Sequence, residues 1–212
     1  MATITSEIQL FNLAVQEFGN YPDIESISSP EIDAERIFAQ SWTICRQMAL
    51  KTLKPNFAIE RANISATVAT PAHGYSYQYL IPSDCLAVLG IGDIEDVANN
   101  SDYAIEGLYI RTDLYTTSSG ADALPIRYIK DISDVSFWTP EFCSAVALYL
   151  AVKTCMAITK DSSKLAFLEE KLRRSKIECC ASNSMENKPI IVRKSNFSSA
   201  RTSWKPRTGY KK

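Results

Sequence analysis

The residue types that most often carry acid–base catalysis are scarce in this sequence. Its one histidine, His73, lies in the string Thr-Pro-Ala-His-Gly-Tyr, where proline and glycine are typical of a loop between two strands. A Cys–His pair would need one of the six cysteines beside His73, and no local motif marks any of them as a nucleophile. We therefore interpret His73 as a loop residue and predict no catalytic residue.

The cysteines and glycines also lack the spacing of a metal or phosphate site. Structural zinc needs four Cys or His ligands in close pairs, and the chain has no Cys-x-x-Cys. Cys179 and Cys180 are neighbours on a predicted helix, so their side chains point about 100° apart. Seven glycines form neither GxGxxG nor GxxxxGK[S/T]. We expect no metal, no cofactor and a reducing compartment.

Clustered carboxylates are the remaining source of acid–base chemistry. Glu169 with Glu170, or Asp93 with Glu95 and Asp96, could act as acid and base in glycoside hydrolysis. The same clusters are typical of a solvated acidic face, and we prefer that interpretation. The chain is thus predicted not to be an enzyme, with a cell-wall hydrolase kept as an alternative.

Charge divides the chain into two parts. Residues 1–187 carry 15 basic and 24 acidic residues, whereas 188–212 carry eight basic residues and no acidic one. The net charges are therefore −9 and +8. We predict one domain over 1–187, large enough to bury a sizeable core, and an extended basic C-terminal tail over 188–212.

Four helices are predicted from apolar periodicity and from start and stop residues. Ser29-Pro30 and Thr139-Pro140 each place proline at the first helical position, and Gly19 and Pro55 end helices. The predicted helices are 5–19, 30–53, 140–158 and 161–185. The apolar helix 140–158 is judged too short to span a membrane, and the N-terminus lacks the features of a signal peptide.

The region 64–130 is β-rich, because β-branched and aromatic residues occur there in short runs separated by turn residues. Tyr75, Tyr77 and Tyr79 alternate, so they share one face of a strand, either at a subunit interface or half-buried within the fold. Strands are expected at 64–70, 75–81, 85–94, 103–111 and 124–130. The predicted fold class is α+β, mainly α. It is an antiparallel bundle of about four helices with a β-rich insert between the second and third, followed by the extended tail.

Short strings in this order resemble a known family. They are Glu7-Ile-Gln-Leu-Phe-Asn-Leu-Ala14, Phe57-Ala-Ile-Glu-Arg-Ala62, Ile81-Pro-Ser-Asp-Cys-Leu86 and Ile126-Arg-Tyr-Ile129. Together they resemble the tail tubular protein A type of head-to-tail adaptor in short-tailed phages, and related head-completion connectors. The family's tryptophan before the Phe-Ala step is replaced by Pro55-Asn56, and 95–122 has no distinctive match.

The resemblance implies a structural virion protein at the head–tail junction, assembled in the host cytoplasm. It implies a ring of twelve copies beneath the portal protein that connects the capsid to the tail, supports the next tail or nozzle protein and lets genomic DNA pass. It implies no membrane partner. A channel built from a −9 body would repel duplex DNA and ease its passage.

The basic tail combines cations with apolar residues that cannot form a core of their own. We expect it to order against a partner, first of all the portal. The alternatives are nucleic-acid contact, through phosphate neutralisation and base stacking, and a plain solvated tail. The predicted portal-binding residues are Ile190, Ile191, Val192, Arg193, Lys194, Phe197, Arg201, Trp204, Lys205 and Arg207.

Overall fold

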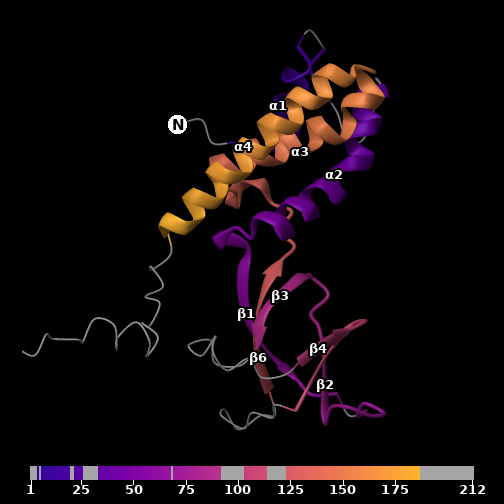
Figure 1. Ribbon diagram of the computed structural model, residues 1–212, viewed down its shortest axis with the longest axis vertical. Helices are drawn as coiled ribbons and strands as arrows, with labels where there is room; N and C mark the ends of the chain where they lie inside the picture. The colour runs from indigo at the N-terminus through magenta and orange to yellow at the C-terminus, as the bar shows by residue number, and fades with distance from the viewer. Residues whose placement is uncertain are drawn as a thin grey trace, which may run out of the picture.

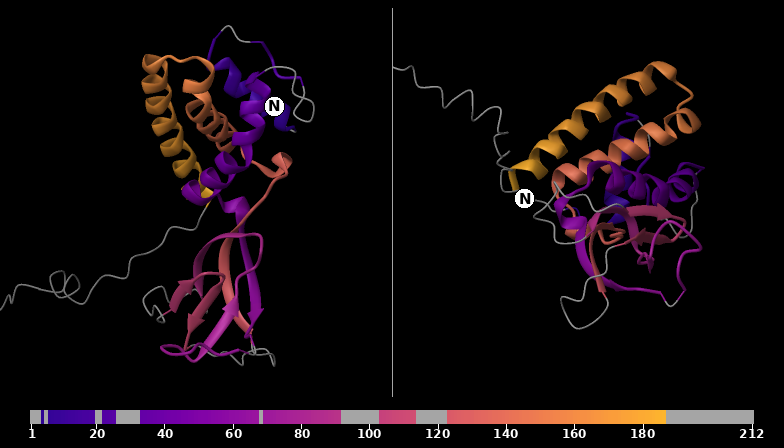
Figure 2. Two further views of the ribbon diagram at one scale, coloured as in Figure 1. Left: turned by 90° about the vertical axis from the view of Figure 1, so that its right-hand side faces the viewer. Right: turned by 60° about the horizontal axis from the view of Figure 1, so that its bottom comes forward.

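The computed structural model describes residues 4, 6–19, 22–25, 33–67, 69–91, 103–113 and 123–186. The tail 188–212, with all ten predicted portal-binding residues, lies outside the described residues, and so do Asp93, Glu95 and Asp96. Figures 1 and 2 show two lobes, one of helices and one of strands, joined end to end.

Four helices form the first lobe, and each begins and ends within three residues of its predicted position. They are α1 (Glu7–Gln16), α2 (Asp33–Leu53), α3 (Pro140–Ile158) and α4 (Ser162–Glu186). The central helix is α3, which packs against the other three. Its alanines at 145, 147 and 151 are buried, and their small side chains permit close helix packing.

The membrane argument made from the length of this helix is wrong. At 19 residues with a mean hydropathy of 1.5, α3 is long and apolar enough to cross a membrane, and it is the one such helix in the described ranges. Its burial under α1, α2 and α4 accounts for the apolar composition instead, because a helix that is hydrophobic all round is typical of a protein core.

Local signals in the sequence explain the helix ends. The Ser6 hydroxyl accepts a hydrogen bond from the Gln9 backbone N–H at 3.3 Å and so caps α1. The Asp161 carboxylate accepts from the backbone N–H groups of Ser163 and Lys164, at 2.9 and 3.2 Å, and so caps the start of α4. At the end of α2, Lys54 has a φ of +47° and precedes a proline, which cannot continue the helix.

The second lobe contains two three-stranded antiparallel sheets, in the orders β1-β6-β3 and β2-β5-β4. The strands are β1 (Ile59–Ser65), β2 (Tyr77–Leu80), β3 (Cys85–Ile91), β4 (Tyr103–Glu106), β5 (Tyr109–Thr112) and β6 (Ala123–Lys130). A bridge between Ala66 and Tyr79, with a 2.9 Å hydrogen bond from the Thr67 N–H to the Gln78 carbonyl, joins β1 to β2. The two sheets are therefore closed on that side.

The predicted fold class is wrong, because it underestimates the share of β-structure. The described residues are about 53% helix and 23% strand, so the protein is a mixed α/β structure and not a helical bundle with a small insert. The β lobe has a core of its own, because five of its side chains are at most 3% exposed. They are Tyr79, Ile110, Leu124, Ile126 and Tyr128.

Two strand assignments account for much of this error. The first strand begins at Ile59 and not at residue 64, so residues 59–63, which were predicted to lie outside any helix or strand, are already in the sheet. The predicted single strand 103–111 is a hairpin of β4 and β5. Gly107 turns the chain there with a φ of +61°, a conformation that glycine adopts without steric cost.

A chain of aromatic rings runs through the helical lobe to its base. Phe11 of α1 meets Trp42 of α2 at 5.3 Å between ring centroids, and Trp42 meets Trp138 at 5.8 Å. Phe142, at the start of α3, contacts both Trp138 and Phe57, at 5.0 and 5.1 Å. Since Phe57 lies two residues before β1, the aromatic core extends to the point where the chain enters the β lobe.

Candidate interaction surfaces

The junction between the lobes contains a buried ion pair. Arg46 of α2 is 9% exposed, and its Nη2 lies 3.0 Å from the carboxylate of Asp131, which directly follows β6. Gln47 Nε2 donates to the same carboxylate at 2.8 Å. Arg46 Nε and Asp131 Oδ1 have no hydrogen-bond partner among the described atoms. The pair therefore fixes the long helix to the end of the central strand, with imperfect hydrogen bonding.

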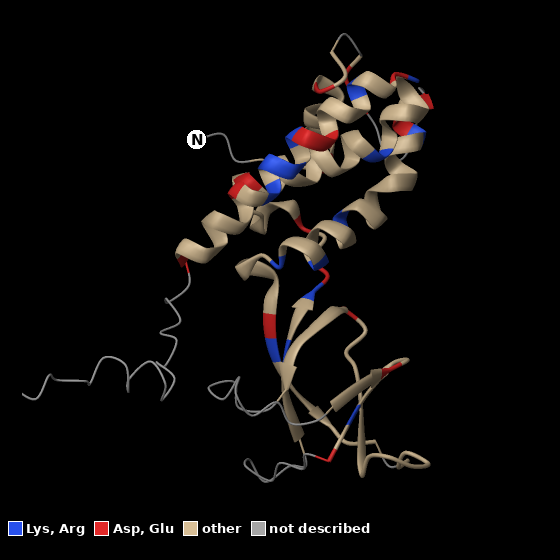
Figure 3. Ribbon diagram, viewed as in Figure 1, with Lys and Arg blue, Asp and Glu red and all other residues tan. Residues whose placement is uncertain are grey.

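A second charged cluster lies on the sheet just below. Lys130 Nζ is 2.7 Å from Glu60 Oε2 and 3.7 Å from Asp84 Oδ2. The hydrogen bond that Lys130 donates to the Glu60 carboxylate raises the pKa of Lys130. Burial and the Asp84 carboxylate raise the pKa of Tyr128, whose hydroxyl donates to Asp84 at 3.4 Å. Figure 3 shows acidic and basic positions close together where the lobes meet.

A groove of about 1010 Å³ opens between the two sheets. Residues from β3, from the end of β2, from the β4–β5 turn and from the last two positions of β1 line it, and Lys51 of α2 is also part of the lining. Three of its aliphatic side chains are largely in solvent: Leu108 is 70% exposed, Leu80 50% and Ile105 48%. An exposed apolar surface of this kind is typical of a binding site.

The apolar surface continues onto the outer face of α2. Ile44 is 53% exposed and Met48 49%, and the two lie one turn apart, with Lys51 less than one turn further on at the groove. Other exposed apolar side chains lie on α4: Phe167, Ile177 and Met185. Both lobes therefore present large hydrophobic side chains to solvent.

The last turn of α4 is attached to the junction. Asn56 Nδ2 donates to the Asn183 carbonyl at 2.8 Å and to Glu186 Oε2 at 3.0 Å. Asn56 lies just before β1, which is an edge strand of its sheet. The last turn of α4 thus lies near the point where the chain enters β1 (Figure 1).

The histidine and the cysteines lie on the surface or in the core. His73 is exposed in a bend before β2, which confirms the predicted loop. All six cysteines are free, and Cys179 is buried whereas Cys180 is exposed, so the two point apart as predicted. Within the described ranges, no group of three or more His, Cys, Asp or Glu could hold a metal ion.

Glu169 and Glu170, the described carboxylates that a hydrolase would use, lie on the solvent-facing side of α4. Glu169 is exposed, and Glu170 accepts hydrogen bonds from Arg173 and Arg174 at 2.8 and 2.9 Å. These two guanidinium groups lower the pKa of Glu170 to about 2, far below the value that a proton donor needs near neutral pH. The arrangement is that of a solvated, salt-bridged surface.

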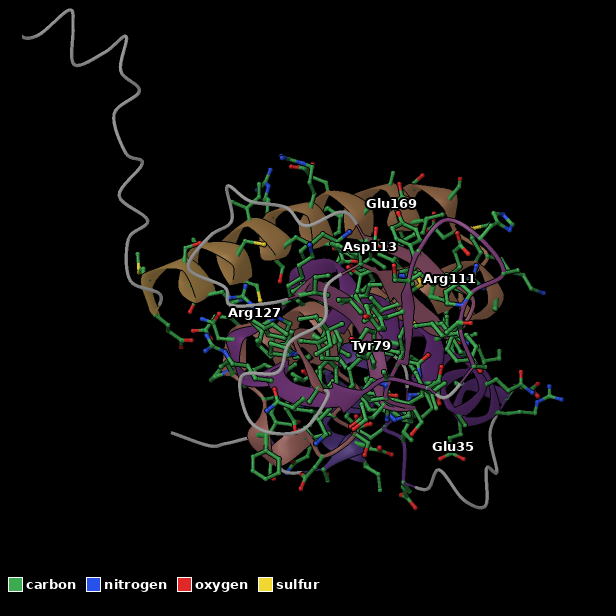
Figure 4. The ribbon with its side chains drawn as sticks, turned by 90° about the horizontal axis from the view of Figure 1, so that it is seen from below. Glu35, Tyr79, Arg111, Asp113, Arg127 and Glu169 are labelled. Carbon is green, nitrogen blue, oxygen red and sulfur yellow. The ribbon has the colours of Figure 1, made fainter. Side chains whose placement is uncertain are left out.

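The three tyrosines do not form one exposed row. Tyr79 is fully buried in the β lobe core, so its predicted place at a subunit interface is wrong. Seen from below, it lies in the middle of the lobe among other side chains (Figure 4). Tyr77 is half-buried in β2, and Tyr75, also half-buried, precedes that strand. Tyr75 and Tyr77 stay predicted interface residues.

Neither the groove nor the buried ion pair was found from the sequence. The hairpin string Ile-Glu-Gly-Leu and the apolar run after Asp84 were visible signals for the groove, but nothing local pairs Arg46 with Asp131, 85 residues away. No protein-family model and no curated protein sequence matches the chain.

Proposed function

We propose that this chain is a structural subunit of a tailed-phage virion, a head-to-tail adaptor that forms a twelve-fold ring beneath the portal. In this proposal the ring assembles in the host cytoplasm, connects the capsid to the tail, supports the downstream nozzle protein and lets genomic DNA through. The protein works by fitting against copies of itself and its neighbours, and it performs no bond-making chemistry.

The observation that carries the proposal is the distribution of exposed apolar side chains. They lie on the outer face of α2, around the groove and along α4, and the most exposed are Leu108 at 70% and Met185 at 87%. Side chains of this size gain free energy when a partner removes them from water, at about 25 cal/mol per Å². A subunit with partners on several sides accounts for them on both lobes.

The order of elements also supports the proposal. The chain runs through two helices, a β lobe and two further helices, which is the order on which the resemblance to head-to-tail adaptors was based. The −9 charge of residues 1–187 suits a channel that does not grip DNA, and the +8 tail supplies a separate binding segment. We propose that this tail docks onto the portal.

Deleting residues 188–212 tests the proposal against its main alternative, a nucleic-acid-binding protein that acts through its tail. The portal and duplex DNA are each titrated with the full-length and shortened chains. Loss of portal binding with DNA affinity unchanged supports the adaptor. Loss of DNA affinity with portal binding unchanged rejects it.

A further inference from the structure

The β lobe is closed on one side and open on the other. The bridge at Ala66 joins β1 to β2, whereas β3 and β4, at the two opposite ends of the strand series, each pair on one side within the described part of the chain. The groove lies between the two sheets and reaches both of these strands, since Cys85 and Val88 of β3 and Ile105 of β4 line it together with the last two residues of β1. An unpaired edge presents backbone donors and acceptors that an additional strand satisfies.

The groove suits a partner segment that has aliphatic side chains in its middle and positive charges on either side. Leu80, Ile105 and Leu108 are about half exposed or more, so a partner that covers them removes apolar surface from water. The carboxylates of Asp84 and Glu106 come directly before groove residues, and their side chains are 38% and 51% exposed. Each contacts a cation of its own chain and stays partly open to solvent.

The first residues of the basic tail have this chemistry. Residues 188–194 read Lys-Pro-Ile-Ile-Val-Arg-Lys: three β-branched residues between basic residues, with proline near the start, where an added strand tolerates it. We propose that residues 188–194 of one copy add as a strand in the groove of a second copy. The more distal residues, from Phe197 to Arg207, then remain for the portal.

The end of α4, which precedes residues 188–194, and the groove lie at different places on the subunit. This arrangement suits binding between neighbouring subunits of a ring. Asn56 holds the last turn of α4 next to the residues that precede β1. Most of the groove lining comes from β3, the end of β2 and the β4–β5 turn, and only Ile64 and Ser65, at the far end of β1, come from that strand. A cyclic ring needs two different surfaces on opposite sides of each subunit, so that contacts are head-to-tail. Ile191 lies five residues beyond Glu186, a reach of about 17 Å when extended, which suits an adjacent subunit.

This inference depends on the proposed ring, and a disulfide tests it. One chain carries Ile191→Cys with Cys85→Ser, and a second, of different isotopic mass, keeps Cys85 in the groove; both carry Cys180→Ser to remove the exposed thiol. The two chains are mixed, assembled on the portal and oxidised. Any 191–85 disulfide then joins two different chains.

We expect covalent dimers at least tenfold above a control pair in which Ser203→Cys replaces Ile191→Cys. Leu108→Asp in the groove chain should lower the yield at least fivefold, while Ala69→Asp, an exposed loop residue of the same lobe, should leave it unchanged. Rings that form without the disulfide overturn the inference and leave the adaptor proposal standing. A disulfide that forms only within one chain carrying both cysteines also overturns it. Failure to form a ring on the portal rejects the adaptor proposal itself.

Discussion

Replacing Asp131 with alanine should destabilise the protein at the junction of its lobes. The carboxylate accepts hydrogen bonds from Arg46 at 3.0 Å and from Gln47 at 2.8 Å, and without it the guanidinium stays buried with no anionic partner. Removing one partner of a buried ion pair costs about 3–5 kcal/mol.

The expected cost of removing Asp131 lies below that range. The two side chains are 11% and 20% exposed, and Arg46 Nε already lacks a partner among the described atoms, so the pair is partly solvated and imperfectly bonded. We therefore expect a loss of about 2–3 kcal/mol in the free energy of unfolding. For a chain of this length that corresponds to a fall in Tm of about 4–12 °C.

Thermal and urea unfolding followed by circular dichroism measure this loss. Asp33→Ala is the matched control, because its pair with Arg36 is 86% and 62% exposed, and it should change stability by no more than about 0.5 kcal/mol. Adding Arg46→Met to Asp131→Ala removes the unpaired guanidinium charge and should restore at least half of the lost free energy of unfolding. Equal effects of Asp131→Ala and Asp33→Ala would show that the Arg46–Asp131 pair contributes no more than an exposed one.

Three further predictions concern the helical lobe. Phe142→Ala removes a fully buried ring packed at 5.0 Å against Trp138 and should cost about 3–5 kcal/mol by urea unfolding; a cost no greater than that of an exposed substitution contradicts it. The pKa of Glu170 is lowered to about 2, so its stabilising contribution is present above its ordinary pKa and is lost as pH falls toward 2. Wild type should therefore lose more Tm than Glu170→Gln on acidification below about pH 5, and parallel curves would argue against the salt bridges. Iodoacetamide at about pH 8 should alkylate exposed Cys180 in the folded chain, whereas Cys179, whose pKa burial raises to about 11, should react only after unfolding; mass spectrometry of the peptides distinguishes them.

The helices were predictable because their signals are local. Capping by Asp161, proline at position 140 and an apolar run from Phe142 each act within a few residues, and the bounds of α3 are the predicted ones. The prediction that the side chains of Cys179 and Cys180 point apart also follows from helix geometry alone.

The β lobe was harder because its signals are short and its core is assembled from distant strands. The Glu106-Gly107 turn was overlooked inside an apolar run, and the strand beginning at Ile59 resembles a continuation of the preceding helix. Whether Tyr79 faces the core or solvent depends on its pairing with β5, and that pairing is tertiary. The groove, the Arg46–Asp131 pair and the attachment of α4 at Asn56 all join residues that are far apart in sequence.

Whether the chain functions as a ring subunit can be seen by negative-stain imaging of the purified protein with and without its portal. We expect a closed twelve-fold ring on the portal, with both lobes of each subunit in contact with a neighbour. Particles that remain single subunits when the portal is present, at concentrations where the portal itself is intact, would contradict it.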